Sequence, residues 1–143
     1  MARHVWTILC TKASIDSRSN NISLFEVVDQ LNVVGPPQDE RVEIPARFDL
    51  VTQWTRSDPE EPERVTGRIS LRLPNGDMVG GSEFEINLSE SLRHRNVISI
   101  SSLPIHGPGD YRFVIDYRPA SGGDWEATYQ LPLQIIFPQA DGA

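Results

Sequence analysis

The three histidines and the single cysteine are the side chains of this sequence best suited to bind a transition metal. His4, His94 and His106 lie far apart, and none has a second histidine two or four residues away. Zinc takes three or four nitrogen or sulfur ligands, and Cys10 with scattered histidines does not supply such a set. The sequence therefore predicts no zinc site, and it predicts that His94, between Arg93 and Arg95, is solvated.

Calcium is the other metal for which the sequence offers ligands. It takes six to eight oxygen atoms, and a β-sandwich can supply them from several loops at one end. No loop has an Asp-x-Asp spacing, and the prolines between residues 58 and 62 favour a solvated acidic loop. The sequence thus predicts no bound metal and no cofactor, although the acidic side chains available for calcium are Asp16, Asp58, Glu60, Glu61 and Asp124.

Covalent and acid–base catalysis find no support in the residue pattern. No serine lies in a Gly-x-Ser-x-Gly frame, and no histidine is marked as its base. Glu60 and Glu61 are adjacent on a loop, where water keeps both ionised, whereas glycoside hydrolysis needs two carboxyl groups across a cleft. The glycines at 80–81 and 122–123 precede no helix, so they indicate bends rather than a phosphate cradle. We therefore expect a protein that is not an enzyme.

Aromatic side chains offer an alternative function as a platform for a sugar. Exposed rings on a β-sandwich can stack against a carbohydrate. Each of the aromatics here lies in phase with an apolar face, which favours packing in the core. The residues concerned are Trp6, Trp54, Tyr117, Trp125 and Tyr129.

Length and charge restrict the class of protein. The 143 residues suffice for one domain with its own core, without disulfides. A net charge of −7 argues against nucleic acid as the main partner, because phosphates require clustered Lys and Arg. No apolar run approaches the length of a membrane span. With a single cysteine, expected to be buried and inert, we predict a cytoplasmic protein.

The stretch from Gly107 to Phe137 carries the strongest structural pattern. Apolar side chains occupy alternate positions in residues 111–117 and again in residues 125–135, and a Gly-rich turn at 119–124 separates the two runs. Alternation with period two is typical of half-buried strands, and two such runs across a short turn predict a β-hairpin.

Further alternating runs lie at residues 46–54, 65–73 and 84–88, and a strand is expected at 97–103. Ile22 to Val34 is expected to form one long central strand covered on both faces for part of its length, since it has apolar residues on both sides. Asn20-Asn21 predicts a turn, because asparagine tolerates a left-handed backbone. Asn75-Gly76 predicts a tight hairpin turn, and Gly80-Gly81 predicts a bulge or a bend. A helical turn is allowed only at 89–95, with Ser89 as its cap.

These patterns predict an all-β fold, an antiparallel β-sandwich of about eight strands, as one domain over residues 1–143. Residues 138–143 are expected to be a disordered tail. The expected core consists of Trp54, Ile69, Leu71, Ile86, Tyr111, Phe113, Ile115 and Leu133.

Two resemblances follow from particular residues. Gly109-Asp110-Tyr111-Arg112-Phe113 resembles the tyrosine corner of immunoglobulin-like domains, with Phe113 at the position of the second disulfide cysteine. In that architecture Trp54 would be the core tryptophan, and Leu24 or Val27 would replace the first cysteine. The opening run Thr7-Ile8-Leu9-Cys10, followed by the run from Ile22 to Asp29, is similar to the first strands of small, uncharacterised bacterial β-sandwich proteins, which implies a bacterial or phage-borne origin and no known activity.

The expected function is a non-enzymatic module that binds another protein or a second copy of itself, with an unknown protein partner or a homodimer as the outcome. The alternative is a small-ligand or carbohydrate binder. If successive strands reverse direction, the turns at 14–21, 57–63, 89–95 and 119–124 gather at one end. The predicted binding residues are Asp58, Glu60, Glu61, Arg93, His94, Arg95 and Asp124, and an exposed edge strand is the competing surface.

Overall fold

The structure is a computed structural model that describes residues 1–35 and 40–138; the expected tail from residue 139 onward lies outside the described residues. The described residues form strands and no helix. The strands are β1 (Arg3–Ile15), β2 (Ile22–Val27), β3 (Gln30–Asn32), β4 (Val42–Thr55), β5 (Glu63–Arg72), β6 (Met78–Leu88), β7 (Arg93–Ile105), β8 (Gly109–Pro119) and β9 (Glu126–Ile136).

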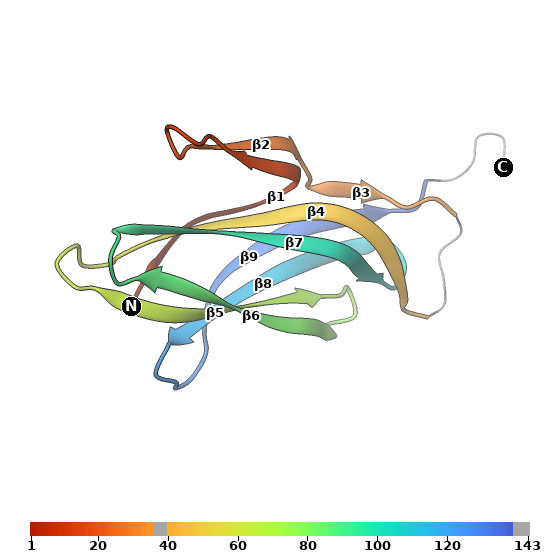
Figure 1. Ribbon diagram of the computed structural model, residues 1–143. Coiled ribbons are helices and arrows are strands. Elements are labelled where there is room, and N and C mark those ends of the chain that lie inside the picture. Colours follow the sequence, from red (N-terminus) through yellow and green to blue (C-terminus); the bar gives the residue numbers. More distant parts are fainter. Residues whose placement is uncertain (36–39, 139–143) are drawn as a thin grey trace.

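Two sheets pack face to face, so the predicted all-β sandwich is confirmed (Figure 1). The first sheet has the order β2-β1-β4-β7 and the second the order β3-β9-β8-β5-β6. The described residues thus contain nine strands rather than eight, and one pair is not antiparallel, because β3 runs parallel to β9.

The predicted hairpin at 107–137 is confirmed as β8 and β9, which pair antiparallel. Tyr111, Phe113 and Ile115 point into the core and are buried. The hydroxyl of Tyr111 donates to the carbonyl of Gly107 at 2.7 Å and accepts from the backbone N–H of His106 at 2.8 Å. The Tyr111 hydroxyl therefore bonds to the backbone four and five residues upstream and holds the β7–β8 turn.

The core lies between the sheets, and every residue predicted for it is buried there. Trp54, Ile86, Tyr111 and Ile115 are completely inaccessible to solvent. The assignment of inward-facing side chains in residues 46–54, 65–73 and 111–117 is therefore correct. A shift of the alternation by one residue would have turned these side chains to solvent.

β1 bends back over the outside of its own sheet. Its first part pairs with β4, while Cys10 to Ile15 pair with β2. The backbone N–H of Ala13 donates to the Asp49 carboxylate of β4 at 2.9 Å. The β1–β2 hairpin (residues 10–27) folds over the outer face of the first sheet (Figure 1), and Cys10 at its base and Val51 of β4 are both fully buried.

The prediction of one long strand over residues 22–34 is wrong. The segment forms two short strands in different sheets, β2 at the edge of the first and β3 at the edge of the second. Glu26 has a left-handed backbone, with φ of 53°, and the chain then crosses between the sheets. Phe25 and Val27 are 52% and 59% exposed, so β2 is an exposed edge and not a covered central strand.

The helical turn allowed at 89–95 is also not formed. The side-chain oxygen of Asn87 accepts from the backbone N–H of Ser89 at 3.0 Å and holds a bend there. β7 begins at Arg93. The local signal was a capping residue with a single apolar anchor, and strand pairing of residues 93–95 with β4 outweighs it.

The turn and bulge predictions are confirmed. Asn20 and Gly76 have left-handed backbones in the β1–β2 and β5–β6 turns, with φ of 60° and 94°. Ile69 pairs with Ser82 and Ser70 with Gly80, so Gly81 is the extra residue of a bulge in β6. Its φ of 103° is a conformation that glycine adopts without strain.

Candidate functional site

The candidate site is a groove at one end of the sandwich, between the β1–β2 turn and the start of β7. Its volume is about 620 Å³. The wall from the β1–β2 turn comprises Ile15 and residues 19–22, and the opposite wall comprises Gln53 of β4 with Arg93, His94 and Arg95 of β7. The residues of the β1–β2 turn and those of β7 are more than seventy positions apart in sequence, and the hydrogen bond from Arg95 to Asn20 joins them.

The two arginines of the groove have different roles. Arg95 is half-buried, and its guanidinium donates to the backbone carbonyl of Asn20 at 3.0 Å, which joins the two walls. Arg93 is exposed, and its guanidinium forms no hydrogen bond or ion pair with any described residue. Arg93 is therefore the cation available to a ligand, while Arg95 holds the groove in shape.

His94 was expected to be solvated, and the structure places it half-buried beside the polar end of the core. It pairs in register with Trp54, and its Nε2 lies 3.3 Å from Oδ1 of Asn96. The Nδ2 of Asn96 is buried without a partner among the described residues. His94 thus lines the groove but is engaged with the interior.

The acidic residues of the β4–β5 loop lie at the same end of the molecule. Arg56 donates to the carbonyls of Leu88 and Pro59, at 2.8 and 2.9 Å, and ties this loop to the β6–β7 connection. Asp58 accepts from the backbone N–H of Glu60 at 3.0 Å, so it stabilises its own turn. Among the described residues, Asp58, Glu60 and Glu61 form no salt bridge with Arg93 or Arg95.

Asp124 lies in the β8–β9 connection, next to Trp125, and none of its contacts joins it to the groove. The structure therefore brings Arg93, His94 and Arg95 together with the β1–β2 turn, sets Asp58, Glu60 and Glu61 on a neighbouring loop, and leaves Asp124 apart. Figure 1 shows the β1–β2, β4–β5, β6–β7 and β8–β9 connections toward the same end of the molecule.

Trp125 does not pack in the core as expected. The guanidinium carbons of Arg68 and Arg118 lie 4.2 and 4.3 Å from its ring centroid, and Arg68 also binds Asp116 on the outer face of the second sheet. The cause is a bulge in β9, where Ile115 pairs with Tyr129 but Asp116 pairs with Ala127. Because of this one extra residue, the side chains that precede the bulge point to the opposite face of the sheet from the one that the alternation predicts.

The other aromatics also depart from a sugar-binding platform. Trp54 is fully buried, with its indole N–H donating to Thr52 at 2.8 Å. Tyr129 stacks on His4, with ring centroids 4.5 Å apart, and links β9 to β1. Trp6 is half-buried. The rings thus serve packing and cation–π contacts, and they form no continuous exposed surface.

The residues considered for metal binding do not converge. Within residues 1–35 and 40–138, no three His, Cys, Asp or Glu side chains lie close enough to hold an ion. Asp16 accepts from the backbone N–H groups of Ser19 and Arg18, at 2.7 and 2.9 Å. These bonds lower the pKa of its carboxyl.

Cys10 is fully buried at the bend of β1. Burial, and then the negative charge of Asp49, raise the pKa of its thiol. A raised pKa keeps the sulfur protonated at neutral pH, which makes it a poor nucleophile.

The described chain also contains no helix long and apolar enough to cross a membrane.

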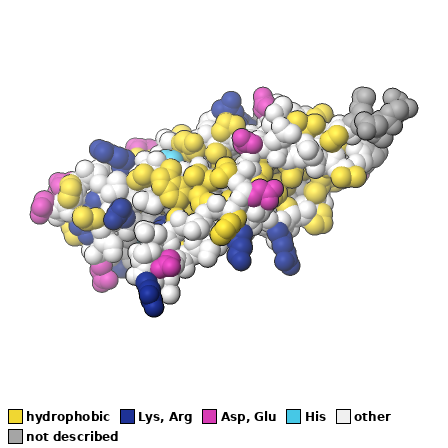
Figure 2. Space-filling model, turned by 90° about the horizontal axis from the view of Figure 1, so that it is seen from above, with side chains coloured by type: hydrophobic (Ala, Val, Ile, Leu, Met, Phe, Trp, Pro, Cys, Tyr) yellow, Lys and Arg dark blue, Asp and Glu magenta, His cyan; other side chains and the backbone are white. Residues whose placement is uncertain are grey.

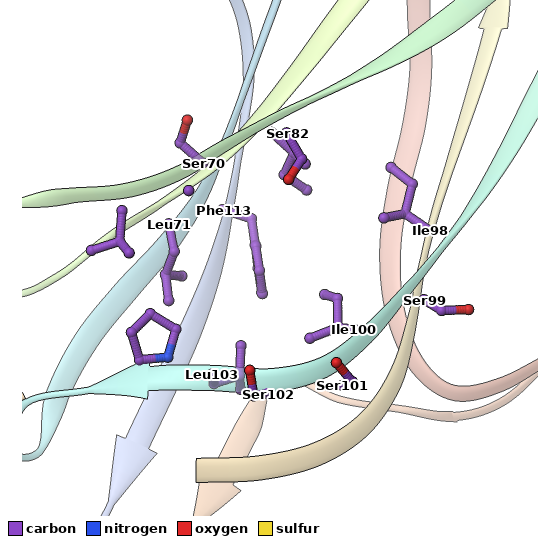
Figure 3. A pocket seen from close by; sticks show the side chains of 14 residues that line it. Ser70, Leu71, Ser82, Ile98, Ser99, Ile100, Ser101, Ser102, Leu103 and Phe113 are labelled. Atoms are coloured by element: carbon purple, nitrogen blue, oxygen red, sulfur yellow. The ribbon is translucent and has the colours of Figure 1, made fainter. Parts of the chain in front are cut away.

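A second, apolar cleft of about 240 Å³ opens between β6 and β7 on one long side of the sandwich. Figure 3 shows Ile98 and Ile100 of β7 pointing toward Phe113, while Ser99 points away from the cleft. Figure 2 shows hydrophobic side chains gathered on the middle of the face that carries the β1–β2 hairpin, with charged side chains around them.

Sequence comparison with protein-family models and with curated proteins finds no match. The contribution of residues 19–22 and Gln53 to the groove was not found from the sequence. Only the Asn20-Asn21 turn signal pointed to that segment, and it did not indicate which surface the turn would contact.

Proposed function

We propose that this protein is a non-enzymatic β-sandwich module that binds a protein partner through the groove at its loop end. The observation that carries the proposal is a groove formed by the β1–β2 turn and the start of β7, in which the guanidinium of Arg93 has no partner among the described residues. Arg95 holds the β1–β2 turn in place, and this leaves the guanidinium of Arg93 at the rim of a preformed groove. Loops fixed on a rigid scaffold are a common place for recognition.

The chemistry of the groove favours a carboxylate-bearing segment of the partner. A guanidinium group binds a carboxylate with two parallel hydrogen bonds. Around Arg93 lie hydroxyl and amide side chains of Ser19, Asn21 and Gln53, which can donate to further oxygen atoms. Ile15 and Ile22 add apolar surface at the turn wall.

The neighbouring acidic loop makes one side of this surface negative and the other side positive. Asp58, Glu60 and Glu61 are exposed and form no salt bridge with the basic wall. A partner segment with acidic residues at one end and basic residues at the other fits this arrangement in one orientation. Complementary charges of this kind contribute mainly to specificity and to the association rate.

The strand order supports an immunoglobulin-like architecture for the module. With β4 to β9 taken as strands B, C, C′, E, F and G, the first sheet contains A, B and E, and the second contains G, F, C and C′. The hydrogen bonds of Tyr111 at the start of β8 agree with strand F. The buried tryptophan departs from that pattern, because Trp54 lies on β4 and not on β5.

The test is a titration of isotope-labelled protein with a hexaglutamate peptide at low salt, followed by NMR. The expected result is that backbone signals of residues 19–22, 53 and 93–95 shift, and that Arg93→Glu abolishes the shifts. Arg112→Glu is the matched control, since Arg112 is an exposed arginine on the opposite sheet and the change in net charge is identical.

Equal loss of binding in both variants would mean that only the overall charge matters, and the groove proposal would be wrong. Shifts confined to other surfaces would contradict it as well. A change in tryptophan fluorescence on adding glycans, with no response to the peptide, would favour the carbohydrate-binding alternative instead.

A further inference from the structure

The two sheets end in four edge strands, and three of these are protected against pairing with another chain. β2 carries Glu26 in a left-handed conformation, which interrupts its ladder. β3 has only three residues. β6 has the bulge at Gly81 and the charged side chains of Glu83 and Glu85. Bulges, short length and charges are the usual means by which edge strands avoid association.

β7 is the fourth edge strand, and its central part lacks such protection. Among the described residues it pairs only with β4, so its other edge offers unpaired backbone groups. From Asn96 to Ile105 the strand contains no charged residue. Pro104 is the single residue there that cannot donate a backbone hydrogen bond, and it lies near the end of the strand.

The space beside this edge is apolar and open. β6 and β7 lie close at their connection and diverge along the molecule (Figure 1). The cleft between them is lined by Ile98 and Ile100 of β7, Leu71 of β5 and Phe113 of β8. A strand added next to β7 would place every second side chain over the mouth of this cleft.

We infer that β7 pairs antiparallel with β7 of a second copy of this chain, around a two-fold axis close to Ile100. The β2-β1-β4-β7 sheets of the two copies then join into one continuous sheet across the dimer. Ser99 of each copy faces Ser101 of the other, and the isoleucines of the added strand extend the apolar lining. A self-complementary strand is what an isologous two-fold interface requires.

Charge selects the antiparallel arrangement. In a parallel pair, Arg93 and Arg95 would lie beside the same residues of the other copy, and like charges opposite each other are unfavourable. With a two-fold axis near Ile100, these arginines lie at opposite ends of the paired segment. Arg93, seven residues from the axis, is then about 23 Å away from it, and the groove at the loop end stays accessible.

The test is sedimentation analysis of the full chain over a range of concentrations, comparing Ser101→Lys, Ser101→Glu and an equimolar mixture of the two. Ser101 is exposed, and its hydroxyl forms no hydrogen bond with any described residue. Each single variant brings two like charges together across the axis, so we expect its dissociation constant to rise by about tenfold or more. The mixture is expected to recover dimer as a heterodimer of opposite charges.

Ser23→Lys is the control, because Ser23 is an exposed serine on the edge strand β2, and it is expected to dimerise like the wild type. Arg93→Glu is also expected to dimerise normally, which separates this inference from the groove. A wild-type chain that remains monomeric at millimolar concentration would overturn the inference. A dimer that persists in both Ser101 variants, or that Ser23→Lys disrupts instead, would place the interface elsewhere and overturn it too.

Discussion

At the scale of single residues, Tyr111 joins the β7–β8 turn to the core. Its ring is fully buried, and its hydroxyl contacts the backbone of both Gly107 and His106. Burial raises the pKa of this phenol, and the bond from the His106 N–H acts in the opposite direction. The hydroxyl is therefore neutral at physiological pH and acts as a structural donor and acceptor.

Tyr111→Phe is expected to destabilise the fold by about 1–3 kcal/mol, because it leaves two backbone groups without their partner while the ring stays in place. Denaturant unfolding followed by fluorescence measures this change. Tyr129→Phe is the control, since that ring is partly exposed and its hydroxyl forms no hydrogen bond with a described residue. Equal effects in the two variants would contradict the role given to the Tyr111 hydroxyl.

His4 is a second residue with a consequence for stability. Its ring is packed edge-on against Trp54 and stacked on Tyr129, and its Nε2 lies 2.6 Å from the Thr7 hydroxyl. Burial lowers the pKa of this histidine below its ordinary value of 6.5. The unfolded chain therefore binds a proton more readily than the folded chain at this position.

The contribution of His4 to stability is present above pH about 6.5 and is lost as the pH falls below that value, toward the lowered folded pKa. We expect the unfolding free energy of the wild type to drop more between pH 7.5 and 5.5 than that of His4→Gln. Urea titrations at both pH values provide the comparison. An identical drop in both proteins would show that His4 is not protonated on unfolding.

At the scale of elements, the pairing of β5 with β6 depends on a glycine under an aromatic ring. Gly67 lies directly opposite Phe84, and a Cβ atom at residue 67 would overlap the Phe84 ring. Phe84 in turn approaches Trp54 of the facing sheet, with ring centroids 6.4 Å apart. The Phe84 ring thus occupies the space that a side chain at residue 67 would fill.

Gly67→Ala is expected to cost about 1–3 kcal/mol in the wild type, because the added methyl group displaces a packed ring. In a Phe84→Ala background the same change is expected to be neutral or stabilising, since glycine weakens a strand interior. A double-mutant cycle from thermal or denaturant unfolding gives the coupling. Additive effects would mean that the ring does not rest on Gly67.

At the scale of the whole molecule, the two long sides of the sandwich differ. One side is closed by the crossing between β2 and β3 and by the stacking of His4 on Tyr129. The other side opens into the cleft between β6 and β7, where Phe113 reaches the opening although it is 4% exposed. The single core extends from one side to the other.

Phe113→Ala is expected to destabilise the protein by about 3–5 kcal/mol, the range for truncation of a buried phenylalanine. A loss below about 1 kcal/mol in denaturant melts would mean that this part of the core is solvated. Met78→Ala serves as a reference, because Met78, the first residue of β6, is 51% exposed.

Metal removal is also a test at this scale. Because the acidic side chains of the described loops do not converge, we expect EDTA to leave the thermal midpoint unchanged and millimolar calcium not to raise it. A ligand that binds only the folded state must stabilise it, so a clear rise in calcium would contradict this expectation.

The sequence by itself determined the core and the strands that build it, because alternation with period two is a local property of the chain. Residues 65–73 and 111–117 carried that pattern without interruption, and their apolar side chains are buried as predicted. Asn75-Gly76 and Gly80-Gly81 were recognised for the same reason, since their turn and bulge depend on backbone angles that few residues adopt.

Only the tertiary structure decided how the elements meet. A single extra residue in β9 turned Trp125 to the outer face, and alternation before and after it looked the same in the sequence. The bend of β1, which brings Asn20 to Arg95, depends on contacts between residues far apart in the chain. The groove and the free edge of β7 therefore followed from long-range packing, which no local periodicity encodes.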